Sequence, residues 1–109
     1  MKVLLVNGSA RVHGYTATAL QQIAQTLETE GIDTQIFQLG AGAYRDCIAC
    51  NRCSDLDGHC VFDDDPVNEF LNLAVQADGF VFGTPVYYAH PSGRILSFLD
   101  RAFYAGGAA

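Results

Sequence analysis

KVLLVNGSARVHGYT, residues 2–16, joins an apolar run to a loop that contains two glycines and one arginine. The run at 3–6 holds only valine and leucine, which is typical of a central parallel strand buried on both faces. TATALQQIAQTLETE, residues 16–30, follows as a predicted helix that Gly31 ends. Its apolar residues at helical spacing are Ala17, Leu20, Ile23, Ala24 and Leu27. A buried strand, a glycine-containing turn and an amphipathic helix predict the opening unit of an α/β domain.

The rest of the chain continues the alternation of strands and helices. DTQIFQL at 33–39 and GFVFG at 79–83 are predicted as the second and third strands. DDDPVNEFLNLAVQADG at 63–79 predicts a helix, because its aspartates complement a positive helix end and Pro66 suits the first helical position. SGRILSFLDRAFY at 92–104 predicts another helix, whose apolar face consists of Ile95, Phe98, Leu99 and Phe103. The order β-α-β-loop-α-β-α predicts a parallel sheet with helices on both faces.

Composition and charge exclude several classes of function for this single domain, residues 1–109. Half of the residues are apolar, and 12 acidic against 6 basic side chains give a net charge of −6. This balance argues against a nucleic-acid partner, because few cations are present to neutralise phosphates. No apolar run approaches the ~20 residues of a membrane span. The apolar stretch after Lys2 is also shorter than the roughly 7–15 residues of a signal peptide core. We therefore expect a cytoplasmic protein without a membrane partner.

The loop after the first strand has the chemistry of an anion site. Ser9, Thr16 and Thr18 offer hydroxyl groups, Arg11 offers a guanidinium, and a helix start offers free N–H groups. The loop lacks the G-x-x-x-x-G-K-[ST] and G-x-G-x-x-G patterns and contains no cysteine, so ATPase, dinucleotide and cysteine-phosphatase sites are not indicated. We expect it to bind a terminal monophosphate. The alternative is a capped helix behind an empty polar loop.

A second loop, TPVYYAHPSG at residues 84–93, follows the third strand and reaches the same edge of the sheet. Pro85 and Pro91 stiffen its backbone, and Tyr87 and Tyr88 offer aromatic faces to a flat ligand. The alternative interpretation makes both tyrosines packing residues. His90 is interpreted as an exposed polar residue rather than a catalytic one.

Four cysteines form the pattern C-x₂-C-x₂-C-x₆-C between the second strand and the next helix. Cys47, Cys50, Cys53 and Cys60 could together hold an iron–sulfur cluster of the 4Fe-4S type. Four thiolates also suit a structural zinc ion. The third alternative is that the thiols are free or packed in the interior.

The motifs N-G-S-x-R-x-x-G-x-T, CxxCxxC, D-D, G-T-P-V-Y-Y and F-L-D-R, in this order, resemble the NADPH-dependent FMN reductase family. The resemblance implies a flavodoxin-like three-layer α/β/α fold with strand order 2-1-3-4-5, bound FMN, and a homodimer or homotetramer. It assigns the FMN phosphate to Ser9, Arg11, Thr16 and the backbone near Ala17, with Tyr15 and Thr18 as further candidates. The flavin ring would lie beside Pro85, Val86, Tyr87 and Tyr88. The cysteine spacing resembles that of the related iron–sulfur flavoproteins.

The resemblance implies an NAD(P)H-dependent oxidoreductase that passes electrons through FMN to a small acceptor such as a quinone or a free flavin. The alternatives are an iron–sulfur flavoprotein or flavodoxin-like electron carrier without nicotinamide turnover, and a metal-stabilised interaction module without flavin. No catalytic side chain is assigned, because the flavin carries the chemistry. Asp100 and Arg101 are interpreted as a structural pair or as helix-end charges, and Leu96 stands where relatives often have lysine.

Three predicted strands are fewer than the five of a flavodoxin-like sheet. We therefore expect the chain to hold the N-terminal β-α-β-α-β-α part of such a domain. The missing strands would come from a longer chain or from a partner, since the free edge of GFVFG would otherwise invite aggregation.

Overall fold

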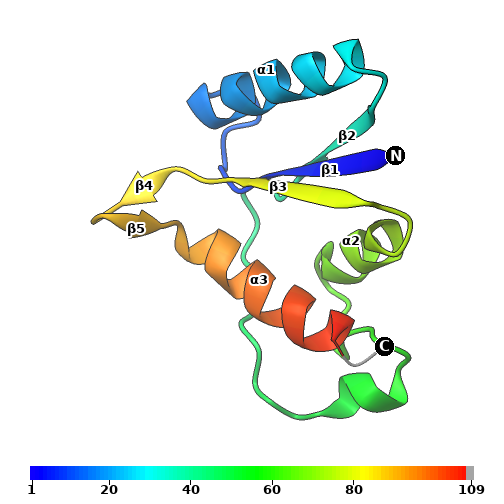
Figure 1. Cartoon of the computed structure of the whole chain (residues 1–109). Helices are drawn as coiled ribbons and strands as arrows, with labels where there is room; N and C mark the ends of the chain where they lie inside the picture. Colours follow the sequence, from blue (N-terminus) through cyan, green and yellow to red (C-terminus); the bar gives the residue numbers. More distant parts are fainter. Residues whose placement is uncertain (108–109) are drawn as a thin grey trace.

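The computed structural model describes residues 1–107, which form a parallel sheet, three α-helices and a projecting hairpin (Figure 1). The elements in chain order are β1 (Lys2–Asn7), α1 (Tyr15–Thr29), β2 (Asp33–Gln38), a 3₁₀ turn η1 (Arg52–Asp55), α2 (Val67–Ala74), β3 (Gly79–Gly83), β4 (Val86–Tyr87), β5 (His90–Pro91) and α3 (Gly93–Gly106). Among these residues no helix is long and apolar enough to cross a bilayer.

The sheet has the order β2-β1-β3, and both neighbours of β1 run parallel to it. Leu5 lies opposite Ile36 of β2 on one side and Val81 of β3 on the other. The valine–leucine run of β1 is buried on both faces of the sheet, as expected for a strand without alternating polar and apolar residues. The order β2-β1-β3 and the crossover helices give a flavodoxin-like α/β fold, which confirms the expected fold class.

Helices cover both faces of the sheet and separate two apolar clusters (Figure 1). Val3 and Leu5 point to the α1 face, where α1 contributes Leu20 and Ala24. Leu4, by contrast, joins the cluster on the opposite face. That larger cluster draws its helical residues from α2 and α3, among them Val67, Phe70, Ile95 and Phe98. The alternation of side chains along β1 therefore fixes the three layers.

Two details of the helices differ from the sequence prediction. The second helix spans Val67–Ala74 and is therefore shorter at both ends than the predicted stretch 63–79, and Pro66 is its N-cap rather than its first helical residue. The aspartates at 63–65 lie outside this helix. The predicted apolar faces are also wider than the buried ones, since Ile23 of α1 and Phe103 of α3 are exposed.

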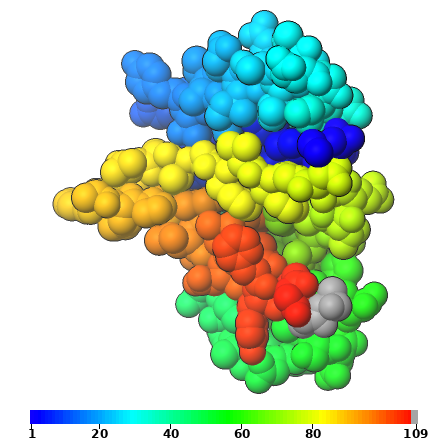
Figure 2. Space-filling model, in the orientation of Figure 1, coloured from blue at the N-terminus to red at the C-terminus, as the bar shows by residue number. Residues whose placement is uncertain are grey.

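The hairpin β4–β5 is an element that the sequence did not predict. Two strands of two residues each pair antiparallel through Tyr87 and His90, and Tyr88 and Ala89 form the connecting turn. Both turn residues have positive φ, 51° and 62°. Such turns ordinarily use Asn or Gly, so this sequence carried no turn signal. Figure 2 shows the hairpin projecting from the body of the molecule.

The first loop and the end of β3 meet at two glycines. The Gly8 N–H donates to the Gly83 carbonyl oxygen over 2.7 Å. A Cβ on Gly8 would lie 2.8 Å from that oxygen and 3.0 Å from Cδ1 of Ile95. A Cβ on Gly83 would lie 2.9 Å from Cγ2 of Thr16 in α1. Only residues without a side chain allow these segments to approach so closely.

Gly8→Ala should lower the free energy of unfolding by about 1–3 kcal/mol, because the added methyl group meets backbone that cannot rotate away. Gly42→Ala is the matched control, since a Cβ there meets nothing within 4 Å. Urea unfolding monitored by circular dichroism measures both variants. Equal stability of the two would contradict this account of the glycine contact.

Candidate functional site

The loop between β1 and α1 is organised by a buried asparagine. The Asn7 side chain is fully buried; its Oδ1 accepts the Ser9 N–H at 3.0 Å, and its Nδ2 donates to Gln38 Oε1 at 2.8 Å. Nδ2 also lies 3.4 Å from the Arg11 carbonyl oxygen. The loop is therefore held at two points by one side chain. Asn7 is the first residue of the N-G-S-x-R-x-x-G-x-T motif, but its hydrogen bonds to the loop are visible only in the structure.

The start of α1 lacks the usual compensation of a helix N-terminus. Gly14 occupies the N-cap without a side-chain hydrogen bond, and the first turn contains no acidic residue. At α3, by contrast, the Ser92 side chain accepts the Ile95 N–H. The first N–H groups of α1 and its positive dipole end are thus left to an external anion or to water.

The predicted phosphate ligands lie along this loop and helix start. Ser9 is buried, and its Oγ accepts the Arg11 N–H at 3.1 Å, which leaves the hydroxyl proton available. The Arg11 side chain is exposed, and among residues 1–107 no carboxylate pairs with it. The Thr18 hydroxyl donates back to the Gly14 carbonyl oxygen at 3.2 Å and is already engaged. The side chain of Tyr15 is exposed.

Two further predicted positions differ in what they can offer. Ala17 lies in the first turn of α1 with its side chain buried, so its backbone N–H is the group that it can offer to a ligand. Thr16 is half-buried, with its methyl group against Gly83. The helix start therefore combines backbone donors with a small number of hydroxyl groups, which is the composition of phosphate sites.

The hairpin places the predicted ring-binding residues on an exposed surface. Tyr87 is 54 % exposed and Tyr88 is 99 % exposed, so the interpretation of these tyrosines as packing residues is wrong. Val86 is exposed as well, and Pro85 is half-buried at the base of the hairpin. Positive φ at Tyr88 and Ala89 holds the turn in a conformation that costs of order 1–3 kcal/mol per residue.

Ser92 ties the two loops together. Its Oγ donates to the Gly8 carbonyl oxygen at 3.3 Å, and its N–H donates to Thr84 Oγ1 at 3.0 Å. The Thr84 hydroxyl in turn bonds the Pro85 carbonyl oxygen at 2.9 Å. The base of the hairpin is therefore fixed against the first loop. Sequence reasoning placed both loops at one edge of the sheet but missed the serine that joins them, because its partner lies 84 residues away.

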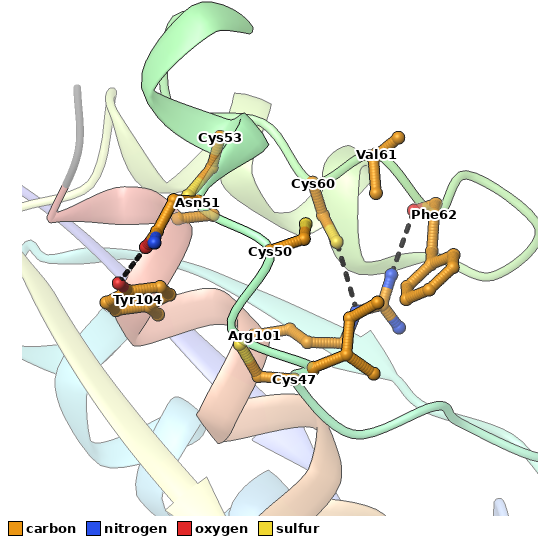
Figure 3. A pocket seen from close by; sticks show the side chains of 11 residues that line it. Cys47, Cys50, Asn51, Cys53, Cys60, Val61, Phe62, Arg101 and Tyr104 are labelled. Atoms are coloured by element: carbon orange, nitrogen blue, oxygen red, sulfur yellow. Dashed lines mark hydrogen bonds between the residues drawn. The ribbon is translucent and has the colours of Figure 1, made fainter.

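A second candidate site lies where the cysteine loop meets α3 (Figure 3). Cys47, Cys50, Cys53 and Cys60 line one pocket, and all four are free thiols. Arg101 is part of the same lining. Within residues 1–107 no three His, Cys, Asp or Glu side chains are arranged to hold one ion. The thiols share a pocket, but they are not converged on a point.

The backbone of the cysteine loop is strained at several positions. Ala49, Asn51 and Asp57 all have positive φ, between 54° and 63°. The Ala49 N–H points at Cys47 Sγ over 3.3 Å, and the Tyr104 hydroxyl bonds Asn51 Oδ1. Such strain persists only where surrounding contacts impose it, and it gathers at functional segments.

Arg101 is the buried cation beneath this loop. It is 1 % exposed and pairs with Asp65, which is buried beside it, so the predicted pairing with Asp100 is wrong. Burial alone would lower the pKa of Arg101, but hydrogen bonds to Asp65 and Cys60 outweigh that effect and raise it. Arg101 is therefore a permanent positive charge at this pocket.

The strand-proximal end of the cysteine loop is fixed by two other contacts. The Tyr44 hydroxyl donates to the Leu39 carbonyl oxygen at 2.8 Å, and burial, aided by Asp65, raises the pKa of Tyr44 to about 12. Arg94 of α3 donates to the carbonyl oxygens of Gly42 and Ala41 at 3.1 and 3.0 Å. The start of the loop is thus closed by Tyr44 and attached to α3 by Arg94.

These features define a flavodoxin-like domain with an open helix N-terminus beside a projecting aromatic hairpin. The family model of the NADPH-dependent FMN reductases matches residues 1–109. The chain therefore belongs to the NADPH-dependent FMN reductase family.

Two relatives and one solved structure show the range of similar proteins. An iron–sulfur flavoprotein of Methanocaldococcus jannaschii is 34 % identical over 102 residues, which cover 94 % of this chain and 52 % of the relative. An NADPH-dependent FMN reductase of Pseudomonas putida is 30 % identical over 100 residues, or 92 % of this chain and 46 % of the relative. The crystal structure of a Streptococcus mutans protein superposes with a TM-score of 0.66 at 17 % identity, covering 94 % of this chain and 53 % of that one. The chain spans about half the length of the curated relatives it matches.

Proposed function

We propose that this chain binds FMN at the β1–α1 loop and acts as an NAD(P)H-dependent flavin oxidoreductase. The observation that carries the proposal is the uncapped start of α1, which has no acid in its first turn and lies behind Ser9 and Arg11. A monophosphate at this point would accept the Ser9 hydroxyl, the Arg11 guanidinium and the first N–H groups of the helix. Bound FMN would supply hydride acceptance from a nicotinamide and electron release to an acceptor.

The flavin ring would lie against the hairpin base at Pro85 and Val86, with Tyr87 and Tyr88 beside it. Support comes from the connection through Ser92, which holds this segment next to the phosphate loop. The tyrosine rings are exposed and therefore free to contact a flat ligand. The chain's own contribution is to orient the ring and to exclude water from one of its faces.

The electron acceptor in this proposal is a small molecule such as a quinone or a free flavin, and the assembly is a homodimer or homotetramer. Membership of the NADPH-dependent FMN reductase family supports a flavin as the acceptor. Steady-state oxidation of NADPH by the purified flavoprotein tests the proposal. Turnover supports it, whereas a protein that holds FMN without oxidising NADPH or NADH would be an electron carrier. A purified protein that binds no flavin would instead be an interaction module.

Arg11→Ala should weaken FMN binding by about 1.5–3 kcal/mol, the scale of a hydrogen bond to a charged group. Riboflavin, which has no phosphate, should bind the variant and the parent protein equally. Arg52→Ala serves as the matched control, because Arg52 lies exposed in η1, away from the loop. Quenching of flavin fluorescence measures all these affinities. Unchanged FMN affinity in Arg11→Ala would count against the phosphate assignment.

A second candidate function, that of an iron–sulfur flavoprotein, is favoured by the cysteine pocket. All four thiols line one pocket next to a buried cation, and relatives of similar sequence are named iron–sulfur flavoproteins. The donor set of four cysteines suits a 4Fe-4S cluster, and positive-φ backbone such as that at Ala49 and Asn51 is common around such clusters. The thiolates would have to move together to share one cluster, because among residues 1–107 they are not arranged around one point. A bound cluster would supply one-electron transfer.

Protein prepared anaerobically with iron and sulfide should contain about four irons per chain if the cysteines hold this cluster. Elemental analysis and acid-labile sulfide measure the content. Cys60→Ser should lose most of the iron while keeping its FMN, because the two sites are on different parts of the fold. Zinc in place of iron would indicate a structural ion, and neither metal would leave the thiols free.

A further inference from the structure

The side chain of Asn7 closes a ring of hydrogen bonds around the first half of the β1–α1 loop. Its Oδ1 accepts the Ser9 N–H at 3.0 Å, so Nδ2 is the end of the amide that donates. The Ser9 hydroxyl oxygen accepts the Arg11 N–H at 3.1 Å, and Nδ2 of Asn7 returns to the Arg11 carbonyl oxygen over a longer 3.4 Å. The backbones of Ser9 and Arg11 are therefore both tied to one side chain.

Gln38 of β2 supports Asn7 from the neighbouring strand. The two residues are paired in the sheet register, and Gln38 Oε1 accepts an Nδ2 proton of Asn7 at 2.8 Å. Asn7 is fully buried whereas Gln38 is exposed, so the amide is enclosed while its partner lies at the surface. With both of its ends engaged, the Asn7 amide has one orientation that satisfies all its partners.

The sheet itself does not require a polar side chain at position 7. Backbone hydrogen bonds already continue the sheet on both sides of β1. The Leu39 N–H donates to the Asn7 carbonyl oxygen at 3.1 Å. On the other side, the Gly8 N–H donates to the Gly83 carbonyl oxygen at 2.7 Å. Burial of an amide costs free energy unless its hydrogen bonds are made, so the loop that Asn7 holds explains why an amide stands here.

The ring of hydrogen bonds also determines where the Arg11 side chain starts. A Cβ added to Gly14, the N-cap of α1, would lie 3.2 Å from Arg11 Cβ and 3.6 Å from its Cδ. The aliphatic part of the arginine thus lies against the uncapped helix start. A fixed Arg11 backbone therefore keeps this positive charge close to the first N–H groups of α1.

We propose that Asn7 is a positioning residue for the phosphate of FMN, which acts through Ser9 and Arg11 and sets the preference for a phosphorylated flavin over an unphosphorylated one. This inference rests on the proposed function of the β1–α1 loop. Asn7 is enclosed, and its amide is already occupied by protein partners. Without it, Ser9 and Arg11 remain in the chain but must be ordered when the phosphate binds, and that ordering costs affinity.

The test measures dissociation constants for FMN and riboflavin by quenching of flavin fluorescence. The selectivity ratio is the riboflavin constant divided by the FMN constant. In Asn7→Ala this ratio should fall about tenfold, near the lower end of what a hydrogen bond to a charged group contributes. Riboflavin has no phosphate, so its own constant should change little.

Asn68→Ala is the matched control, because the Asn68 amide also holds a loop with both of its ends. Its Oδ1 accepts the Cys60 N–H at 2.7 Å, and its Nδ2 donates to the Cys60 carbonyl oxygen at 2.9 Å. The variant thus loses comparable hydrogen bonds in the cysteine loop instead of the β1–α1 loop. Its selectivity ratio should equal that of the parent protein.

A second variant and a second measurement cover the case in which Asn7→Ala does not fold. Gln38→Met removes only the acceptor that β2 supplies at the surface, and its selectivity ratio should fall about threefold, the scale of one neutral hydrogen bond. In flavin-free protein, hydrogen exchange of the Ser9 and Arg11 amides should be faster in both variants than in the parent. Asn68→Ala should leave the exchange of these amides unchanged.

The outcomes separate this inference from the proposed function. A parent protein that binds riboflavin as tightly as FMN would overturn the phosphate assignment and the role of Asn7 together. A selective parent whose ratio is retained in Asn7→Ala, or in Gln38→Met where Asn7→Ala does not fold, would overturn the role of Asn7 alone. An equal fall of the ratio in Asn68→Ala would overturn it as well. A fall confined to the variants of the β1–α1 loop and its β2 partner would support it.

Discussion

The hydrogen bond from the Gly8 N–H to the Gly83 carbonyl oxygen is the contact on which the functional edge depends. It continues the pairing of β1 with β3 one residue beyond the sheet. It also brings the first loop into direct backbone contact with the segment that leads into the hairpin. The absence of side chains at both glycines also lets Thr16 and Ile95 close over the contact. The start of α1 and the base of the hairpin are consequently parts of one rigid edge, and Ser92 reinforces it from the α3 side.

The cysteine loop is held by side-chain hydrogen bonds and an ion pair rather than by backbone pairing. Its residues form one short 3₁₀ turn and little other regular structure, so side chains of α3 hold it instead. The buried pair of Arg101 and Asp65 is the central contact of this kind. A buried ion pair seldom adds stability over apolar packing, but the loss of one partner is costly, typically 3–5 kcal/mol. The Arg101–Asp65 pair therefore determines the position of the loop more than it adds to the stability of the domain.

The sequence predicted the regular elements well because their signals are local. The valine–leucine run of β1 and the spacing of Leu20 and Ala24 are readable within a few residues. The hairpin was missed because Tyr88 and Ala89 adopt positive φ, whereas hairpin turns of this kind normally contain glycine or asparagine. Contacts between residues that are far apart in the sequence could not be predicted from such local signals either.

The Arg101–Asp65 pair shows why such contacts escape sequence reasoning. Asp65 looked like a helix-start charge and Asp100 looked like the natural partner of Arg101, since they are neighbours in sequence. Residues adjacent on a helix point in different directions, however, and the buried side of α3 faces the segment around Asp65. The predicted phosphate residues were brought to one edge, whereas the roles of Asn7 and Ser92 emerged only from their buried hydrogen bonds.

The central claim is that the uncapped start of α1 receives the phosphate of FMN. Backbone amide spectra of ¹⁵N-labelled protein, titrated separately with FMN and riboflavin, test it most directly. The account predicts that the amide signals of Ser9, Arg11 and Thr16 shift with FMN and remain in place with riboflavin, while those of Tyr87 and Tyr88 shift with both. Equal responses of the loop amides to both flavins, or FMN shifts confined to other segments, would contradict it.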